Sequence, residues 1–264
     1  MNVDTPSQPS APVGAVGHIV LTRPQGENQN LKAAILQLSG PDWADAITQA
    51  PLLAFSAVNT DTLAAHLAAI GPDDWLIFVS PRAVSYAFAQ HPELALAKAQ
   101  FACVGKATRA ALQQRGVARV WAPEQRFDSE GLLALLAGQP MQNRRVVIIR
   151  GMTGRTHLAK ALTARGAKVA FCPVYQCHCQ LLPDYLHQQP ASSLLVVITA
   201  PMALECLAKQ SDAQTLLELN LVVINQRTLE KARRLGFAGG IEVAGSPETS
   251  ALARAVGRFL TPAA

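Results

Sequence analysis

An internal repeat constrains the fold of this 264-residue chain more than any other feature of its sequence. Three segments recur in the same order, and each is a β-branched run that leads through a turn into a segment with helical periodicity. The repeat pairs HIVLTRPQGENQNLKAAI with RVVIIRGMTGRTHLAKAL, DWLIFVSPRAV with SLLVVITAPMAL, and ACVGKATRAALQQRG with VVINQRTLEKARRLG. It places Arg23 and Arg150 at equivalent strand ends and Thr108 on Thr228. We infer the duplication of a unit of roughly 120 residues, which is an ordinary domain size.

The short apolar runs alternate with longer Ala- and Leu-rich segments, which predicts a parallel sheet flanked by helices. Right-handed crossovers would bring the turns after these strands to one edge of each sheet, where open α/β sheets bind their ligands. Two lobes with such edges would form a cleft between them. The expected strands are His18 to Thr22, Trp75 to Val79, Phe101 to Val104, Val146 to Arg150, Leu194 to Thr199 and Leu221 to Ile224.

The charge of the chain favours a small anionic substrate over a nucleic acid. The net charge is +5 and the pI about 9.1, yet only 16% of the residues are charged and no Lys or Arg run stands out. A nucleic-acid reader concentrates charge and interleaves aromatic residues, which make up only 5% here. Scattered solvated charges remain the alternative explanation of the basic bias.

The N-terminal segment and the cysteines indicate a cytoplasmic protein. Residues 1–17 are rich in Pro, Ser and Gly and lack a basic start and an apolar core, so we expect a flexible leader and no export. The strongest apolar run, Ser193 to Ala200, is too short to span a membrane. Five cysteines are an odd number for a reducing compartment, and we expect no disulfide.

Six segments of the chain resemble those of the uroporphyrinogen-III synthases. Each motif alone is weak, but their order and spacing are specific, and together they cover nearly all of the chain from Leu21 onward. The segments are TRP (Thr22 to Pro24), DWLIF.S..AV (Asp74 to Val84), VG.AT..AL...G (Val104 to Gly116), SEGLL (Ser129 to Leu133), RG..GR..L...L...GA.V....VY (Arg150 to Tyr175) and SP.....A (Ser246 to Ala253).

The resemblance implies an α/β fold of two flavodoxin-like lobes with parallel sheets, joined by a two-stranded connector. The first lobe would be discontinuous, with residues 18–50 and 180–264, and the second would be residues 54–172. The connectors would lie near residues 51–53 and 173–179, so that the return strand from Phe171 to Gln180 belongs to them.

The resemblance also implies an enzyme, a cyclising lyase of porphyrin and heme biosynthesis that needs no cofactor. Its substrate would be hydroxymethylbilane, a linear tetrapyrrole with eight carboxylates and a leaving hydroxyl at one end. The enzyme would assist loss of that hydroxyl and fold the chain so that the last ring closes with inversion, giving uroporphyrinogen III. Because the bilane also closes spontaneously to the uninverted isomer, much of the task is positioning.

Tyr175 matches the tyrosine of the family's VY motif and is the expected catalytic residue. Its phenol could donate a hydrogen bond or a proton to the departing hydroxyl. The alternative is a tyrosine that packs against a lobe with its hydroxyl in water.

Substrate carboxylates would be held by backbone N–H groups at helix starts and by arginine side chains near those turns. Ordinary capped turns and solvated surface arginines are the alternatives. Two turns depart from the family pattern: Thr199-Ala200-Pro201 stands where the family often has serines, and Asn225 stands where glycine or serine is usual. The expected substrate-binding residues are Arg23, Ser80, Arg82, Gly105, Lys106, Thr108, Arg150, Gly151, Arg155, Thr199, Ala200 and Thr228.

Two further motifs carry weaker hypotheses. The RGMTGR loop could cradle a phosphate, but it lacks the endings of a P-loop and of a dinucleotide fold. In CPVYQCHC, the residues Cys177, His178 and Cys179 are good zinc ligands. A strand would direct His178 away from the two cysteines, so we expect no metal site.

Two other functions stay open on sequence grounds. One is a non-catalytic two-lobed binding protein for a small anionic ligand, and the other is a nucleotide or sugar-phosphate enzyme on a doubly wound fold. The expected partners are the tetrapyrrole substrate and the enzyme that makes hydroxymethylbilane, which could hand it over. We expect neither nucleic acid nor membrane binding, and a monomer.

Overall fold

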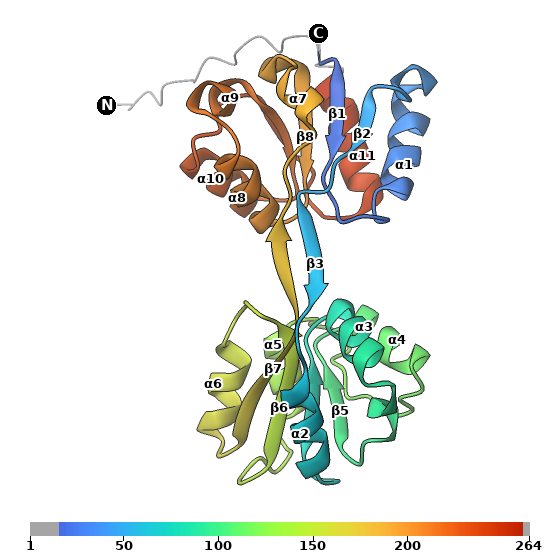
Figure 1. Ribbon diagram of the computed structural model, residues 1–264, viewed down its shortest axis with the longest axis vertical. Coiled ribbons are helices and arrows are strands. Elements are labelled where there is room, and N and C mark those ends of the chain that lie inside the picture. The colour runs from blue at the N-terminus through green and yellow to red at the C-terminus, as the bar shows by residue number, and fades with distance from the viewer. Residues whose placement is uncertain (1–15, 261–264) are drawn as a thin grey trace, which may run out of the picture. The chain divides into compact units, whose positions relative to one another are not determined.

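The computed structural model describes residues 16–260 and divides the chain into two compact units (Figure 1). The first unit combines the chain up to Ala54 with the chain from His178 onward, and the second unit is Phe55–Cys177. Most of the expected leader, residues 1–15, lies outside the described residues.

The first unit contains a five-stranded sheet in the order β10-β9-β8-β1-β2, with parallel pairing throughout. Counted along the chain this is the order 2-1-3-4-5, which is the flavodoxin-like arrangement. The strands are β1 (His18–Leu21), β2 (Ile47–Gln49), β8 (Leu194–Ile198), β9 (Asn220–Val223) and β10 (Ile241–Val243).

Helices cover both faces of this sheet (Figure 1). Ile19 and Leu21 of β1 pack into a core with α1 (Gln29–Ser39) and α11 (Thr249–Leu260), since alternate strand residues share a face. On the other face lie α8 (Pro201–Lys209) and α10 (Gln226–Arg234). The remaining helices of this unit are α7 (Asp184–His187), α9 (Ala213–Glu218) and the 3-10 turns Pro41–Trp43 and Ala191–Ser193.

The second unit contains a sheet in the order β3-β7-β6-β4-β5, and a parallel bridge from Ala102 to Trp121 extends it beyond β5. If β6 is counted first, β7-β6-β4-β5 follows the same order as the first unit, so the duplicated fold is circularly permuted here. The strands are β3 (Leu53–Ala57), β4 (Trp75–Phe78), β5 (Gln100–Cys103), β6 (Arg145–Gly151) and β7 (Lys168–Cys179).

Strand residues of the second unit alternate between two apolar cores. Leu76 and Phe78 of β4 face a core with α2, α3 and α4, while Trp75 and Ile77 face a core with α5 and α6. All four side chains are at most 3% exposed, which explains the unbroken apolar run in the sequence. The helices are α2 (Asp61–Ala69), α3 (Pro81–Gln90), α4 (Lys106–Gln114), α5 (Ser129–Leu135), α6 (His157–Ala164) and the 3-10 turn Pro92–Leu96.

Two extended segments connect the units, as the predicted connector requires. The chain passes from one unit to the other after Ala54 and again after Cys177. Backbone hydrogen bonds join Gln180 N to Leu52 O at 2.9 Å and Val58 N to Val174 O at 3.3 Å, so the two segments run in opposite directions. The α/β fold of two parallel sheets with a two-stranded connector is therefore confirmed.

All six strands expected from the repeat form, and no strand end differs from its expected bound by more than one residue. β2 and β10 were missed because each has only three residues. β3 (Leu53–Ala57) begins within the connector expected near residues 51–53 and extends four residues further. The return strand was expected only as a connector, but residues 168–175 of β7 also pair with β6 inside the sheet.

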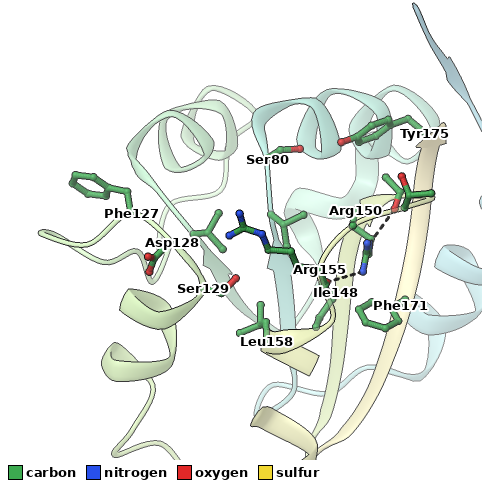
Figure 2. A pocket seen from close by; sticks show the side chains of 15 residues that line it. Ser80, Phe127, Asp128, Ser129, Ile148, Arg150, Arg155, Leu158, Phe171 and Tyr175 are labelled. Carbon is green, nitrogen blue, oxygen red and sulfur yellow. Dashed lines mark hydrogen bonds between the residues drawn. The ribbon is translucent and has the colours of Figure 1, made fainter. Parts of the chain in front are cut away.

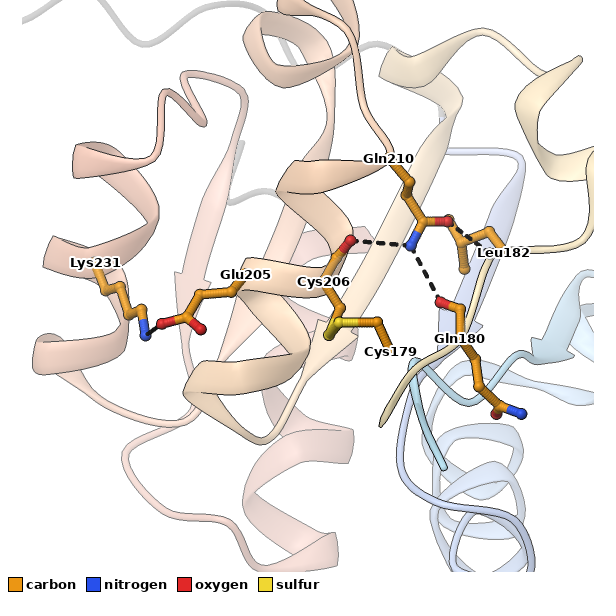
Figure 3. The surroundings of a disulfide bond; sticks show 7 residues. All are labelled: Cys179, Gln180, Leu182, Glu205, Cys206, Gln210 and Lys231. Carbon is orange, nitrogen blue, oxygen red and sulfur yellow. Dashed lines mark hydrogen bonds and ion pairs between the residues drawn. A yellow bond between two sulfur atoms is a disulfide. The ribbon is translucent and has the colours of Figure 1, made fainter. Parts of the chain in front are cut away.

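The prediction that the chain has no disulfide is wrong in this structure, because Cys179 is bonded to Cys206 (Figure 3). The Cα atoms lie 5.3 Å apart, one at the end of β7 and the other in α8, and such closeness across 27 residues cannot be read from spacing. Gln210 ties the same elements independently, since its side-chain amide donates to Gln180 O at 3.2 Å. Cys103, Cys172 and Cys177 are free thiols.

Within residues 16–260, no helix combines the length and the apolar character that crossing a membrane requires.

We expect Cys206→Ser to lower the free energy of unfolding of oxidised protein by about 3 kcal/mol, because the disulfide restricts a long loop of the unfolded chain. Urea denaturation without reductant measures the difference, and Cys177→Ser is the matched control with a free thiol. With excess reductant the wild type and the Cys206 variant should converge. A difference that persists in reductant would show that lost packing, not the disulfide, is responsible.

Candidate functional site

A cavity of about 320 Å³ opens at the carboxyl edge of the second unit's sheet (Figure 2). β6 and β4 are neighbours in this sheet. The connection from β6 leads outward to β7 on one side, and the connection from β4 leads outward to β5 on the other, so the strand order reverses between β6 and β4. Open α/β sheets bind ligands at such a point. The cavity is lined by Val79, Ser80, Val104, Phe127, Asp128, Ser129, Ile148, Arg150, Gly151, Thr153, Gly154, Arg155, Leu158, Phe171 and Tyr175.

Tyr175 lies at one side of this cavity, where a bulge in the pairing of β6 and β7 sets its direction. Arg150 pairs with Pro173 but Gly151 pairs with Tyr175, so Val174 is skipped and remains buried. Gly151 permits the close approach, because a Cβ there would lie 2.8 Å from the Tyr175 ring.

Aromatic contacts fix the position of the Tyr175 ring, but its hydroxyl has no hydrogen-bond partner within the described residues. The ring contacts those of Tyr86 and Phe55, with centroids 5.5 and 5.8 Å away, and the backbone carbonyl accepts from Met152 N at 2.8 Å. Within the described residues no side chain or backbone group hydrogen-bonds to the hydroxyl. A phenol that is fixed in position and free to donate can act as a proton donor.

Arg150 faces the loop that follows its own strand. Nε donates to Gly151 O and Nη1 to Arg155 O, both at 3.1 Å, and the guanidinium lies 4.7 Å from the Phe171 ring centroid. The residue is only 7% exposed. Burial lowers the pKa of Arg150 from its ordinary value, and the nearby Tyr175 partly opposes this.

Arg155 supplies the accessible positive charge of the cavity. Figure 2 shows its side chain reaching across the centre of the cavity, away from Arg150. Within residues 16–260 its guanidinium has no hydrogen-bond or ion-pair partner, and the residue is exposed. A free guanidinium of this kind can hold a carboxylate by two parallel hydrogen bonds.

The loop before α5 forms the side of the cavity opposite Phe171. In the sequence, the only signal for this loop was the SEGLL motif that follows it. Asp128 caps α5 by accepting from Gly131 N at 2.9 Å and Glu130 N at 3.0 Å. The Gly131 N–H chiefly, followed by Arg126, lowers the pKa of the Asp128 carboxyl. Phe127, which is 44% exposed, offers an apolar face that no sequence signal indicated.

Five of the expected site residues line this cavity, and the other four from the second unit lie nearby in other roles. The five are Ser80, Arg150, Gly151, Arg155 and Tyr175. Ser80 Oγ caps α3 by accepting from Ala83 N at 3.1 Å. Of the other four, Arg82 lies 3.7 Å from the Phe55 ring centroid and Lys106 lies 4.7 Å from the Phe127 ring centroid. Gly105 is the N-cap of α4, and Thr108 is only 3% exposed.

The expected site residues of the first unit lie at the carboxyl edge of its own sheet. Arg23 donates to Pro247 O at 2.5 Å and to Thr249 Oγ1 at 3.4 Å. Thr199 and Ala200 form the turn from β8 to α8, where Ala200 caps without a side-chain bond. Thr228 is 2% exposed, and both its N–H and its hydroxyl donate to Asn225 Oδ1 at 3.0 Å.

In the part of the chain that the structure describes, no three metal-ligating side chains gather into a site. Of the three candidates in CPVYQCHC, Cys179 is in the disulfide and Cys177 is a free thiol whose pKa is raised by burial.

Known proteins resemble this chain over most of its length. A family model described as uroporphyrinogen-III synthase HemD matches residues 46–253. The uroporphyrinogen-III synthase of Escherichia coli K12 is 31% identical over 253 residues, which cover 90% of this chain and 99% of that protein. The uroporphyrinogen-III synthase of Salmonella typhimurium LT2 is 31% identical over 250 residues, with the same coverage.

Two solved structures share the fold. The uroporphyrinogen-III synthetase of Helicobacter pylori 26695 aligns with a TM-score of 0.61 at 15% identity, over 90% of this chain and 97% of that one. A mutant uroporphyrinogen III synthase of Thermus thermophilus gives 0.60 at 17% identity, over 93% and 100%. With the family model and the sequence relatives, the agreement leads to one conclusion: the chain belongs to the uroporphyrinogen-III synthase family.

Proposed function

We propose that this protein performs its family's reaction, the cyclisation of hydroxymethylbilane to uroporphyrinogen III with loss of water, at the cavity of the second unit. The observation that carries this assignment is that one cavity is lined by a tyrosine with a fixed ring and by an exposed guanidinium, and that neither the hydroxyl nor the guanidinium has a partner within residues 16–260. Family membership favours this cyclising lyase over the binding protein and the phosphate-dependent enzyme that the sequence left open.

The proposed reaction needs a proton donor where the substrate's hydroxyl departs. Tyr175 donates a hydrogen bond or proton to that oxygen, so that water leaves and an electrophilic azafulvene forms. The last pyrrole ring then attacks through its substituted carbon, and a spiro intermediate rearranges with inversion of that ring. These steps break one carbon–oxygen bond, release water, and form and rearrange carbon–carbon bonds without net oxidation or reduction, so the proposal requires no cofactor.

The same cavity would hold substrate carboxylates and pyrrole rings. Arg155 provides the charge, while Ser80 and Gly151 lie at the helix-side turns. Phe127 and Phe171 offer exposed ring faces on opposite sides of Arg155 (Figure 2), suited to flat pyrroles.

The other expected contacts remain part of the proposal, because one cavity of this size cannot hold all the carboxylates of a tetrapyrrole. Hydrogen bonds to the capping side chain of Asn225 favour a structural role for Thr228, and burial leaves the Thr108 side chain little access to a ligand. The residues proposed as further contacts are Arg23, Arg82, Gly105, Lys106, Thr199 and Ala200.

We place the enzyme in the cytoplasm as a monomer that receives its substrate directly from the enzyme that makes it. A direct handover suits a substrate that closes spontaneously to the wrong isomer. In a reducing cytoplasm Cys179 and Cys206 would be adjacent thiols, and the disulfide would be the form of the oxidised protein.

The decisive experiment supplies freshly made hydroxymethylbilane, oxidises the product and separates type I from type III porphyrin by chromatography. We expect type III to predominate with the protein and type I without it. A product distribution equal to that of the spontaneous reaction would reject the proposal.

Tyr175→Phe should lower kcat by about 10- to 100-fold with little change in KM, because it removes only the proton donor. The expected loss is near the low end for acid catalysis, since the hydroxyl also departs spontaneously. Tyr185→Phe is the matched control, because that hydroxyl donates to Thr48 in the first unit. Full turnover by the Tyr175 variant would remove this residue from the mechanism.

Gly151→Ala should displace the Tyr175 ring, because the added Cβ would lie 2.8 Å from it. We expect a loss of about 1–3 kcal/mol in the free energy of unfolding from overpacking, together with a lower kcat. Gly138→Ala is the control, since no atom lies within 4 Å of a Cβ there. Wild-type turnover by the Gly151 variant would contradict the proposed position of Tyr175.

Arg155→Met should raise KM by about tenfold or more, because it removes a charged hydrogen-bond donor from a carboxylate. The salt dependence of KM should also weaken, because salt screens the pair that has been lost. Steady-state kinetics at several ionic strengths provides both values. Arg115→Met, at the exposed end of α4, is the control. An unchanged KM would make Arg155 a bystander.

A further inference from the structure

We infer that Arg150 is a positioning residue, which shapes the loop of residues 151–155 and acts on the substrate only through that loop. The inference deepens the proposed function and rests on it, because the loop provides one wall of the proposed substrate cavity. It concerns how Arg155 and Tyr175 are held in place for the reaction.

The guanidinium of Arg150 has no free edge for a carboxylate. A carboxylate that binds through two parallel bonds needs either Nε with one terminal nitrogen or both terminal nitrogens. Nε donates to Gly151 O and Nη1 donates to Arg155 O, so each of these edges already has one engaged nitrogen. The remaining Nη2 lies against Gly154, where a Cβ would be only 2.4 Å away.

The same bonds close the loop around the side chain. They fix the carbonyls of its first and last residues, Gly151 and Arg155, to one rigid planar group. Gly154 has φ +145 and no side chain, which lets the backbone pass beside the guanidinium. A further bond from Met152 N to Tyr175 O ties the loop to β7. Arg150 therefore fixes the loop backbone that sets the direction of the Arg155 side chain. The same loop is bonded to β7, the strand that carries Tyr175.

The internal repeat provides a second example of the same use of an arginine. Arg23 occupies the equivalent position after β1, and its guanidinium also turns to its own unit, bonding Pro247 O and Thr249 Oγ1. There it joins the end of β1 to the start of α11. Burial lowers the pKa of both arginines, as expected for cations withdrawn from water.

The test compares Arg150→Lys with Arg150→Met in the type I and type III assay. Lysine keeps the charge but is a point donor that cannot bridge two carbonyls as a planar fork does. A positioning role predicts that both variants lower kcat and the type III share similarly, by at least about fivefold in kcat. It also predicts that KM and its salt dependence change to the same extent in both variants, because both misplace Arg155 alike. A direct carboxylate contact predicts that lysine preserves KM while methionine raises it and weakens its salt dependence, and that outcome would overturn the inference.

Gly154→Ala gives an independent test that leaves Arg150 itself in place. The added Cβ would displace the guanidinium, so we expect the kinetics of Arg150→Lys. Gly40→Ala is the matched control, because its φ of +99 imposes similar backbone strain with no neighbour within 4 Å. If Arg150→Met fails to fold, the lysine and Gly154 variants still decide. Wild-type kcat and type III share in a folded Gly154 variant would reject the inference.

The assay of the wild-type protein distinguishes a failure of the proposed function from a failure of the positioning role of Arg150. If the wild type gives no excess of type III product, the proposed function fails. If the wild type gives type III product but the variants keep the wild-type isomer ratio, only the positioning role fails.

Discussion

Burial of both faces of two parallel sheets is the constraint on which the rest of this structure depends. Because β4 and β6 are covered by helices on each side, their strand residues must be apolar and the chain can expose polar groups only at the strand ends. Right-handed crossovers then bring one set of ends to one edge. The cavity with Tyr175 lies at that edge, where strand order reverses between β6 and β4, so its position follows from the packing of the sheet.

The apolar periodicity and the repeat were enough to predict the parallel sheets and six of the strands that form them. They did not indicate β2 or β10, since three residues are too few for a periodic signal. The link between Cys179 and Cys206 could not be predicted either, because it depends on where β7 ends relative to α8. Spacing along the chain does not contain that information, and the compartment argument against disulfides pointed the other way.

The sequence was enough to predict which turns and residue types form the candidate site, but not the direction in which each side chain points. Arg150 and Arg155 looked alike in the sequence, yet one is 7% exposed against backbone carbonyls and the other points into the cavity. Tyr175 depends on a bulge opposite Gly151, and alternation along a regular strand would have given a different facing. Phe127 was missed because an exposed phenylalanine after an irregular loop has no sequence pattern.

The duplicated turns also show that the two units are not equivalent toward an anion. In the second unit Ser80 caps α3 with its side chain while Gly105, before α4, has none to offer. In the first unit the roles are exchanged, since Ala200 leaves α8 without a side-chain cap and Asn225 caps α10. A capping oxygen occupies one of the N–H groups that a ligand would otherwise use. The two halves of the repeat therefore leave their free N–H donors after different strands, so the duplication has not kept the two sheet edges equivalent.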